Sequence, residues 1–179
     1  MEKGKIIWLN GVSSSGKSTL AKTLQDRLSV PFYVLANDMF TNDTVAPDKF
    51  IEIDWRGTYY KALIGMYHAI KAFTDIGINI IVDDVLLKED DRLEQCVKLF
   101  HDYPVLFVHV ICPLDELRHR EEKRGDRNIG QAESQLAELN PQDTYDITVD
   151  TFHETLEQCA DRIIEMLNYP EKLTAFKTL

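Results

Sequence analysis

The chain has 179 residues, the usual size of one globular domain, so we expect a single domain over residues 1–179. It carries 20 Lys and Arg against 30 Asp and Glu, which gives a formal net charge of -10 at pH 7. This charge disfavours nucleic-acid polymers and anionic membrane surfaces as partners. Hydrophobic residues make up 44% of the chain and charged residues 28%, which excludes a disordered or fibrous protein.

The cysteines and the apolar runs indicate the cellular compartment of the protein and whether it spans a membrane. Cys96, Cys112 and Cys159 form no Cys-x-x-Cys pair, so neither a disulfide framework nor a thiolate zinc site is indicated. The apolar run at 6–9 is too short for a secretory signal, and the run at 105–112 is far shorter than the ~20 residues that span a bilayer. We therefore expect a cytoplasmic protein without a membrane span.

Short β-branched runs alternate with longer segments of helical period along the whole chain. The first strand is followed by a glycine-rich turn and by a helix that Pro31 ends. The last strand is followed by a helix that a Thr151-x-x-Glu154 capping box is expected to open. In chain order the expected strands are 5–10, 32–36, 78–82, 105–111 and 146–149, and the helices between them centre on 20–28, 59–73, 93–100 and 113–125.

This alternation predicts an α/β fold. Five nearly continuous apolar strands separated by helices predict a mainly parallel, five-stranded sheet that is covered by helices on both faces. Two stretches interrupt the alternation, residues 42–55 and the charged segment 118–135. Such interruptions are candidates for substrate loops and lids, and we interpret 118–135 as a lid-like segment.

The segment after the first strand reads Gly-Val-Ser-Ser-Ser-Gly-Lys-Ser and matches the phosphate-loop pattern G-x-x-x-x-G-K-[ST] between a strand and a helix. Glycines allow backbone N–H groups to converge on phosphate oxygens, and the following helix adds its positive end. Lys17 can bridge the β- and γ-phosphates, and the Ser18 hydroxyl can ligate Mg²⁺. The expected nucleotide-binding residues here are Gly11, Val12, Ser13, Ser14, Ser15, Gly16, Lys17, Ser18 and Thr19.

Two carboxylates, Asp83 and Asp84, end the third expected strand. From this position an acid can reach a magnesium ion or its water shell beside a phosphate loop. Both residues are candidates for the metal site, and Asp83 is the first choice. In the alternative interpretation, a strand-end aspartate only caps the next helix.

Asp38 follows the second strand, at the edge of a parallel sheet where ligands bind. A carboxylate there can accept the proton of a substrate hydroxyl, or orient that hydroxyl, while its oxygen attacks the γ-phosphorus. The alternative is an N-cap for a helix that starts at Met39.

Five cations within ten residues stand out in an acidic protein. They are Arg118, Arg120, Lys123, Arg124 and Arg127. A mobile arginine segment can stabilise the charge that builds on the γ-oxygens and can exclude water. In the alternative, the cations pair with neighbouring glutamates on a solvated helix face, which we favour for Arg118 and Lys123. Arg124 and Arg127 are the better lid candidates.

Histidines and tyrosines give weaker signals. No histidines repeat at metal-ligand spacing, so we expect His68 and His109 to be packed rather than catalytic. Tyr59, Tyr60 and Tyr67 lie at helical spacing and favour core positions, although one of them could line a substrate pocket.

Several segments in fixed order carry a resemblance to a known family. They are residues 6–18, 80–87 (Ile-Ile-Val-Asp-Asp-Val-Leu-Leu), 108–113, 124–127 (Arg-Gly-Asp-Arg) and 145–151. With these motifs the chain resembles the chloramphenicol phosphotransferase family of small P-loop kinases, nearly from end to end. The resemblance implies a three-layer, adenylate-kinase-like P-loop NTPase fold, ATP with Mg²⁺ as cofactors, and phosphoryl transfer to a substrate alcohol.

The resemblance also implies residue roles. Asp38 matches the family's catalytic base, and Arg124 and Arg127 match the lid arginines near the ATP phosphates. Apart from the resemblance, Arg120 on the same segment is a further candidate for ATP binding. Much of the acceptor pocket is implied to come from residues 41–53. The acceptor itself stays open, because one scaffold carries many specificities.

Three functional hypotheses follow. The first is an ATP-dependent O-phosphotransferase for a small hydroxylated molecule, in which Lys17, Arg124 and Arg127 neutralise charge and Asp38 faces the hydroxyl. The second is a nucleotide-dependent switch or regulatory NTPase with a protein partner, in which the 118–135 segment responds to the γ-phosphate. The third is a nucleoside or nucleotide kinase, or a kinase of nucleic-acid ends. The sequence leaves the oligomeric state open.

Overall fold

The computed structural model describes residues 2–41, 55–88, 91–124, 129–141 and 144–179. Five strands form one sheet in the order β2-β3-β1-β4-β5, and every neighbouring pair is parallel. The strands are β1 (Ile6–Asn10), β2 (Phe32–Ala36), β3 (Asn79–Asp84), β4 (Val105–Ile111) and β5 (Ile147–Asp150). The predicted five-stranded parallel sheet is thus confirmed.

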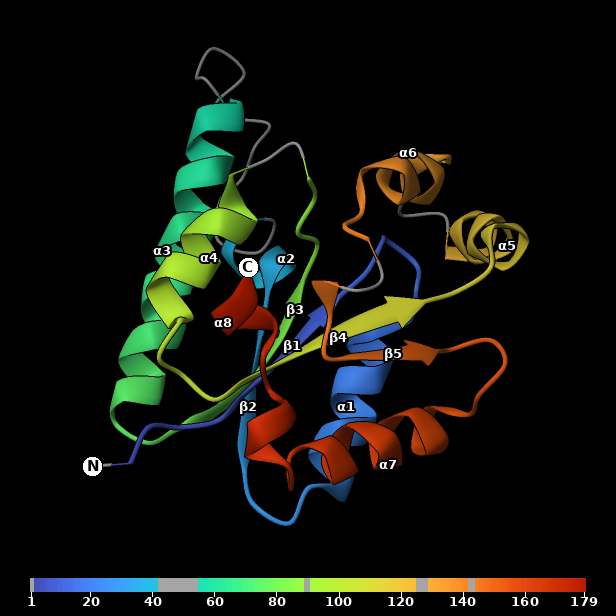
Figure 1. Ribbon diagram of the computed structural model, residues 1–179. Coiled ribbons are helices and arrows are strands. Elements are labelled where there is room, and N and C mark those ends of the chain that lie inside the picture. Colours follow the sequence, from blue (N-terminus) through green and yellow to red (C-terminus); the bar gives the residue numbers. More distant parts are fainter. Residues whose placement is uncertain (1, 42–54, 89–90, 125–128, 142–143) are drawn as a thin grey trace.

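Helices cover both faces of this sheet, which gives three layers (Figure 1). One face is covered by α3 (Trp55–Asp75), α4 (Arg92–Phe100) and α8 (Ala175–Thr178), and the other by α1 (Lys17–Arg27) and α7 (Leu156–Met166). The short helix α2 (Asn37–Thr41) follows β2, and a 3-10 turn, Pro170–Lys172, precedes α8. No helix among the described residues is long and apolar enough to cross a membrane.

The central strand β1 is fully buried, and its side chains alternate between the two layers. Ile6 and Trp8 pack with α3, α4 and α8, whereas Ile7 and Leu9 pack with α1 and α7. Because β1 lies in the middle of the sheet, the chain that leaves it enters the centre of the edge where the parallel strands end. In open α/β sheets this edge is where ligands bind.

Beyond that edge lie two further helices, α5 (Leu114–Arg124) and α6 (Gln131–Glu138) (Figure 1). Leu117 from α5 and Ala132 from α6 pack against Val12 of the first loop. Arg118 on α5 also forms an ion pair with Glu133 on α6, with Nη2 2.9 Å from Oε2. Within the segment expected as an interruption, the described residues 118–124 and 131–135 are helical.

The start of α7 corrects one expectation. The capping box is formed by Thr155 and Gln158, not by Thr151 and Glu154. The Thr151 hydroxyl instead donates to the Ser15 carbonyl, 2.6 Å away, and a Glu154 carboxylate oxygen accepts a bond from Arg162, 2.7 Å away. Both side chains have partners elsewhere, so the helix begins one turn later.

Candidate active site at the carboxyl edge of the sheet

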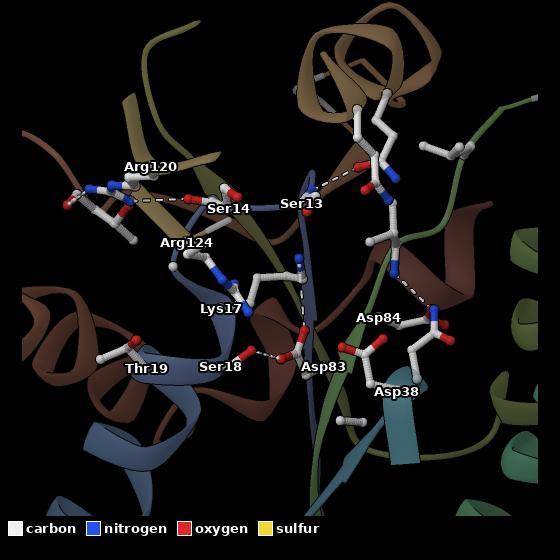
Figure 2. Close-up of a pocket in the computed structure, with 18 of the residues that line it drawn as sticks. Ser13, Ser14, Lys17, Ser18, Thr19, Asp38, Asp83, Asp84, Arg120 and Arg124 are labelled. Atoms are coloured by element: carbon white, nitrogen blue, oxygen red, sulfur yellow. Dashed lines mark hydrogen bonds and ion pairs between the residues drawn. The ribbon is translucent and has the colours of Figure 1, made fainter. Parts of the chain in front are cut away.

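A cavity of about 780 Å³ lies along the carboxyl edge of the sheet. Its walls come from the loop after β1, from the segment after β2, from the end of β3 and from α5 and α6, and Figure 2 shows how the side chains converge. Of the residues expected to bind nucleotide, eight line the cavity: Ser13, Ser14, Gly16, Lys17, Ser18, Thr19, Arg120 and Arg124. Gly11, Val12 and Ser15 are buried beneath it.

The loop after β1 has a backbone shape that only certain residues allow. A Cβ atom at Gly11 would lie 2.3 Å from the Val110 carbonyl oxygen, so only glycine permits this close approach to β4. Ser14 and Gly16 have φ angles of 62° and 93°, in the left-handed region. The loop therefore curls around the N-terminus of α1, where the first amide groups have no acceptor within the helix.

The side chain of Lys17 is held inside this loop. Its ammonium group donates to the carbonyl oxygens of Gly11 and Val12, at 2.9 and 3.0 Å. The same nitrogen lies 3.8 Å from Asp83 Oδ1, and Lys17 is only 7% exposed. The cation is thus fixed between the loop and the carboxylate at the end of β3.

Ser18 and Asp83 meet across the floor of the cavity. The Ser18 hydroxyl donates to Asp83 Oδ2 over 2.6 Å (Figure 2). A hydroxyl and a carboxylate are oxygen ligands of the kind that Mg²⁺ uses, and Mg²⁺ keeps several waters beside them. The loop also holds an unpartnered buried hydroxyl, Ser14 Oγ. This donor set and the curled glycine-rich backbone fit a nucleotide phosphate chain with its magnesium ion.

Asp84 has a different environment from its neighbour Asp83. It is fully buried, and its carboxylate accepts hydrogen bonds from Tyr67 at 2.8 Å, from Asn37 at 2.9 Å and from the Val85 amide at 2.7 Å. Arg92 Nη1 lies 3.3 Å away, which forms a buried ion pair. Burial beside this carboxylate raises the pKa of Tyr67 far above its ordinary value. Asp84 is therefore occupied by protein partners, whereas Asp83 faces the loop.

Asp38 lines the same cavity from the first turn of α2. Because α2 begins at Asn37, Asp38 is not the N-cap residue that the alternative interpretation required. Tyr59 lines the cavity as well, and its hydroxyl lies 3.4 Å from Asn37 Oδ1. Of the three tyrosines at helical spacing, Tyr67 is in the core and Tyr59 is the one that reaches the pocket.

The cations of α5 divide between the cavity and the surface. Arg120, Lys123 and Arg124 line the cavity. Lys123 is exposed, as expected for a solvated helix face, but it also borders the cavity, which was not expected. Arg120 donates to the Ser14 carbonyl at 3.3 Å and braces the loop. Arg118 lies on the surface, as expected, but its partners are Asp115 of α5 and Glu133 of α6, which differ from the acidic residues expected. Arg127 and residues 42–54 lie outside the described residues.

The two histidines differ. His109 is buried and stacks on Tyr145, with ring centroids 4.3 Å apart, which confirms the expectation of packing. Burial lowers the pKa of His109 to about 4. His68 is exposed on α3, so the expectation of packing is wrong there. Its position falls on the solvent side of the helix, between the buried Tyr67 and Ile70.

Sequence reasoning missed two residues that hold the site together. Gln135 on α6 accepts a hydrogen bond from the Ser13 amide, and Thr151 after β5 supports the loop from the other side. A glutamine in a charged helix carries no signal of its own. The sequence pattern assigned Thr151 to a helix cap instead of to the loop.

A family model for chloramphenicol phosphotransferase-like proteins matches residues 4–168. The chain belongs to this family. Its members are kinase-type phosphotransferases, and the parallel sheet with its phosphate loop agrees with that class. The family predicted from the motifs is thus confirmed.

Individual relatives agree at this level. A Mycobacterium tuberculosis protein that carries the provisional name O-phosphotransferase is 28% identical, and the match covers 92% of this chain and 83% of the relative. An adenylyl-sulfate kinase of Clostridium acetobutylicum is 27% identical over 93% of this chain and 84% of its own length. The solved APS kinase CysC of M. tuberculosis, in complex with AMPPNP and APS, has a TM-score of 0.70 and 19% identity, covering 94% of this chain and 99% of that one. This last likeness concerns the fold, and it confirms a P-loop kinase architecture.

Proposed function

We propose that the protein is an ATP-dependent O-phosphotransferase that moves the γ-phosphoryl group to a hydroxyl of a small molecule. The observation that carries this proposal is one continuous cavity lined by the phosphate loop, by Asp83 and by Asp38. Figure 2 shows the hydrogen bond between Ser18 and Asp83 beside Lys17. Asp38 lies on the side of Asp83 that faces away from the loop. A nucleotide and an acceptor can therefore meet in this space.

The nucleotide side would be held by the backbone of residues 11–19. Lys17 would place its charge between the β- and γ-phosphates, and Ser18 with Asp83 would hold Mg²⁺ directly or through its waters. The bound ion supplies charge neutralisation on the phosphate oxygens. Arg124 on α5, and Arg127 after it, would add positive charge on the opposite wall.

The acceptor side would be organised around Asp38. In the proposed step the acceptor oxygen forms a bond to the γ-phosphorus, the bond from that phosphorus to the leaving ADP oxygen breaks, and the hydroxyl proton passes to the Asp38 carboxylate. Asp84 was a second metal candidate. Because Tyr67, Asn37 and Arg92 occupy its oxygens, we assign it the role of a positioning residue for the acceptor wall.

Product analysis tests the proposal. The protein is incubated with Mg-ATP and a panel of alcohols that includes chloramphenicol and adenylyl sulfate, because the family and one group of relatives carry these names. We expect one acceptor to gain a single phosphoryl group while an equal amount of ADP forms, and the Lys17→Met variant to form neither. Slow ADP formation that no alcohol accelerates would contradict the proposal and favour the switch hypothesis.

A further inference from the structure

A glutamine side chain occupies one amide of the phosphate loop. Gln135 Oε1 accepts a hydrogen bond from the Ser13 backbone N–H over 2.7 Å, and the two residues are 122 positions apart in the chain. Both residues line the cavity. The dashed line at Ser13 in Figure 2 marks this bond, whose acceptor is the Gln135 side chain on α6. The loop therefore binds a neutral oxygen from its own protein at a position that could bind a ligand oxygen.

The position of Ser13 suggests which ligand oxygen that would be. In Figure 2, Ser14 and Arg120 lie on one side of the loop, whereas Ser13 lies on the side nearer Asp38 and Asp84. Under the proposed function the γ-phosphoryl group lies between the Lys17 ammonium and Asp38. The Ser13 amide is thus at the γ-phosphate end of the loop, not at the end where α1 begins.

We infer that Gln135 is a positioning residue that stands in for a γ-phosphate oxygen at the Ser13 amide and is displaced by a nucleoside triphosphate but not by a diphosphate. This inference rests on the proposed function, because it requires a triphosphate in the loop. The chemistry is direct. The Gln135 oxygen carries lone pairs toward Ser13, so an incoming phosphate oxygen is repelled until the side chain turns away.

The displacement would reach the cations of α5 because α5 and α6 are tied together. The buried Glu121 carboxylate on α5 accepts hydrogen bonds from the Gly130 and Ala132 amides at the start of α6, at 2.9 and 2.7 Å. The ion pair between Arg118 and Glu133 adds a second link. A shift of α6 that accompanies the release of Gln135 would act on α5 through these links, and α5 carries Lys123 and Arg124 along the cavity wall.

Nucleotide affinities test the inference with variants of opposite effect. Dissociation constants for the Mg²⁺ complexes of ADP and of a non-hydrolysable ATP analogue are measured by calorimetry. In Gln135→Ala the amide is free, so we expect the analogue to bind about two- to tenfold more tightly while ADP changes less than about twofold. In Gln135→Glu the carboxylate holds the amide and repels the γ-phosphate, so we expect the analogue to bind about tenfold more weakly, again with a smaller effect on ADP.

The control is Ser134→Ala, one residue away on the exposed side of α6, which should leave the ratio of the two constants unchanged. Equal shifts for both nucleotides in the Gln135 variants, or weaker analogue binding in Gln135→Ala, would overturn the inference and leave the proposed function standing. If the wild-type protein binds neither nucleotide, the proposed function fails, and this inference fails with it.

Discussion

The two halves of the cavity are built in different ways. The nucleotide half is mainly a stretch of backbone that is shaped by Gly11 and Gly16. Hydrogen bonds from the Lys17 ammonium to carbonyl oxygens of the loop hold it in place. The proposed acceptor half consists of side chains from α2, α3, α4 and β3, which are joined by the hydrogen bonds and the ion pair of Asp84. A backbone site recognises any triphosphate, whereas a side-chain site can change with each substitution. Under the proposed function, the nucleotide would therefore be specified locally and the acceptor by tertiary structure.

The largest expected effect separates the two halves at Asp38. In Asp38→Asn the acceptor hydroxyl loses its proton acceptor, so we expect kcat to fall by about 10²- to 10⁴-fold. The affinity for the ATP analogue should stay within about twofold, because Asp38 lies outside the loop. Steady-state kinetics and calorimetry check this, with Asp26→Asn on the exposed side of α1 as the matched control. Near-normal turnover in Asp38→Asn would remove the residue from the reaction.

A second test compares the neighbouring carboxylates of β3. Asp84→Asn removes the carboxylate charge from the buried ion pair with Arg92, so we expect the free energy of unfolding to fall by roughly 3 kcal/mol. Asp83→Asn should change stability less, because the Lys17 ammonium keeps its hydrogen bonds to two loop carbonyls, and it should raise the Mg²⁺ concentration needed for turnover. Urea unfolding and magnesium titration of both variants provide the measurement. Equal losses of stability would contradict the division of roles.

A third test addresses the sheet beneath both halves. The pKa of His109 is about 4 in the folded protein because of burial, against an ordinary value near 6.5. Between these values the unfolded chain binds a proton that the folded chain does not, so stability falls as the pH drops from about 6.5 to 4, by roughly 3 kcal/mol in total. In His109→Phe, which keeps a ring against Tyr145, this part of the pH dependence should vanish. An unchanged slope in the variant would show that other groups cause it.

The smallest expected effect lies at the rim of the acceptor half. Tyr59→Phe removes a hydroxyl that donates a long hydrogen bond, 3.4 Å, to Asn37 Oδ1. We expect the KM for the acceptor to rise by about two- to threefold, with kcat and nucleotide affinity nearly constant. Exposed Tyr33→Phe on β2 is the control. If nucleotide affinity changed more than the KM for the acceptor, the assignment of Tyr59 to the acceptor half would be contradicted.

The sequence was sufficient to predict the sheet and the position of the phosphate loop. Hydrophobic periodicity located β2 and β4 to the residue, and the phosphate-loop motif marked its own structural context. These features are local, because a strand buried on both faces and a glycine-dependent turn impose their residue types directly. Asp38 and Asp83 could be predicted as cavity residues because parallel strands end at one edge of the sheet.

The remaining features depend on contacts between distant residues. Asp83 and Asp84 are adjacent acids, and only the side chains of Tyr67, Asn37 and Arg92 distinguish them. The bond from Ser13 to Gln135 joins the first loop to a helix that sequence reasoning interpreted as part of a lid. Likewise, the Thr151 hydroxyl donates to the carbonyl of Ser15, 136 positions away, whereas the cap of α7 is formed by Thr155. None of these pairings has a periodic or local pattern.

The central claim is that the loop after β1 binds the triphosphate of a nucleotide and that Lys17 contributes to this binding. The most direct test is a calorimetric titration of the wild-type protein and of Lys17→Met with the magnesium complex of a non-hydrolysable ATP analogue, with exposed Lys22→Met as the control. We predict one site per chain in the wild type and in Lys22→Met, and a loss of affinity of at least about tenfold in Lys17→Met. The absence of binding in folded wild-type protein, or equal binding by Lys17→Met, would contradict the account.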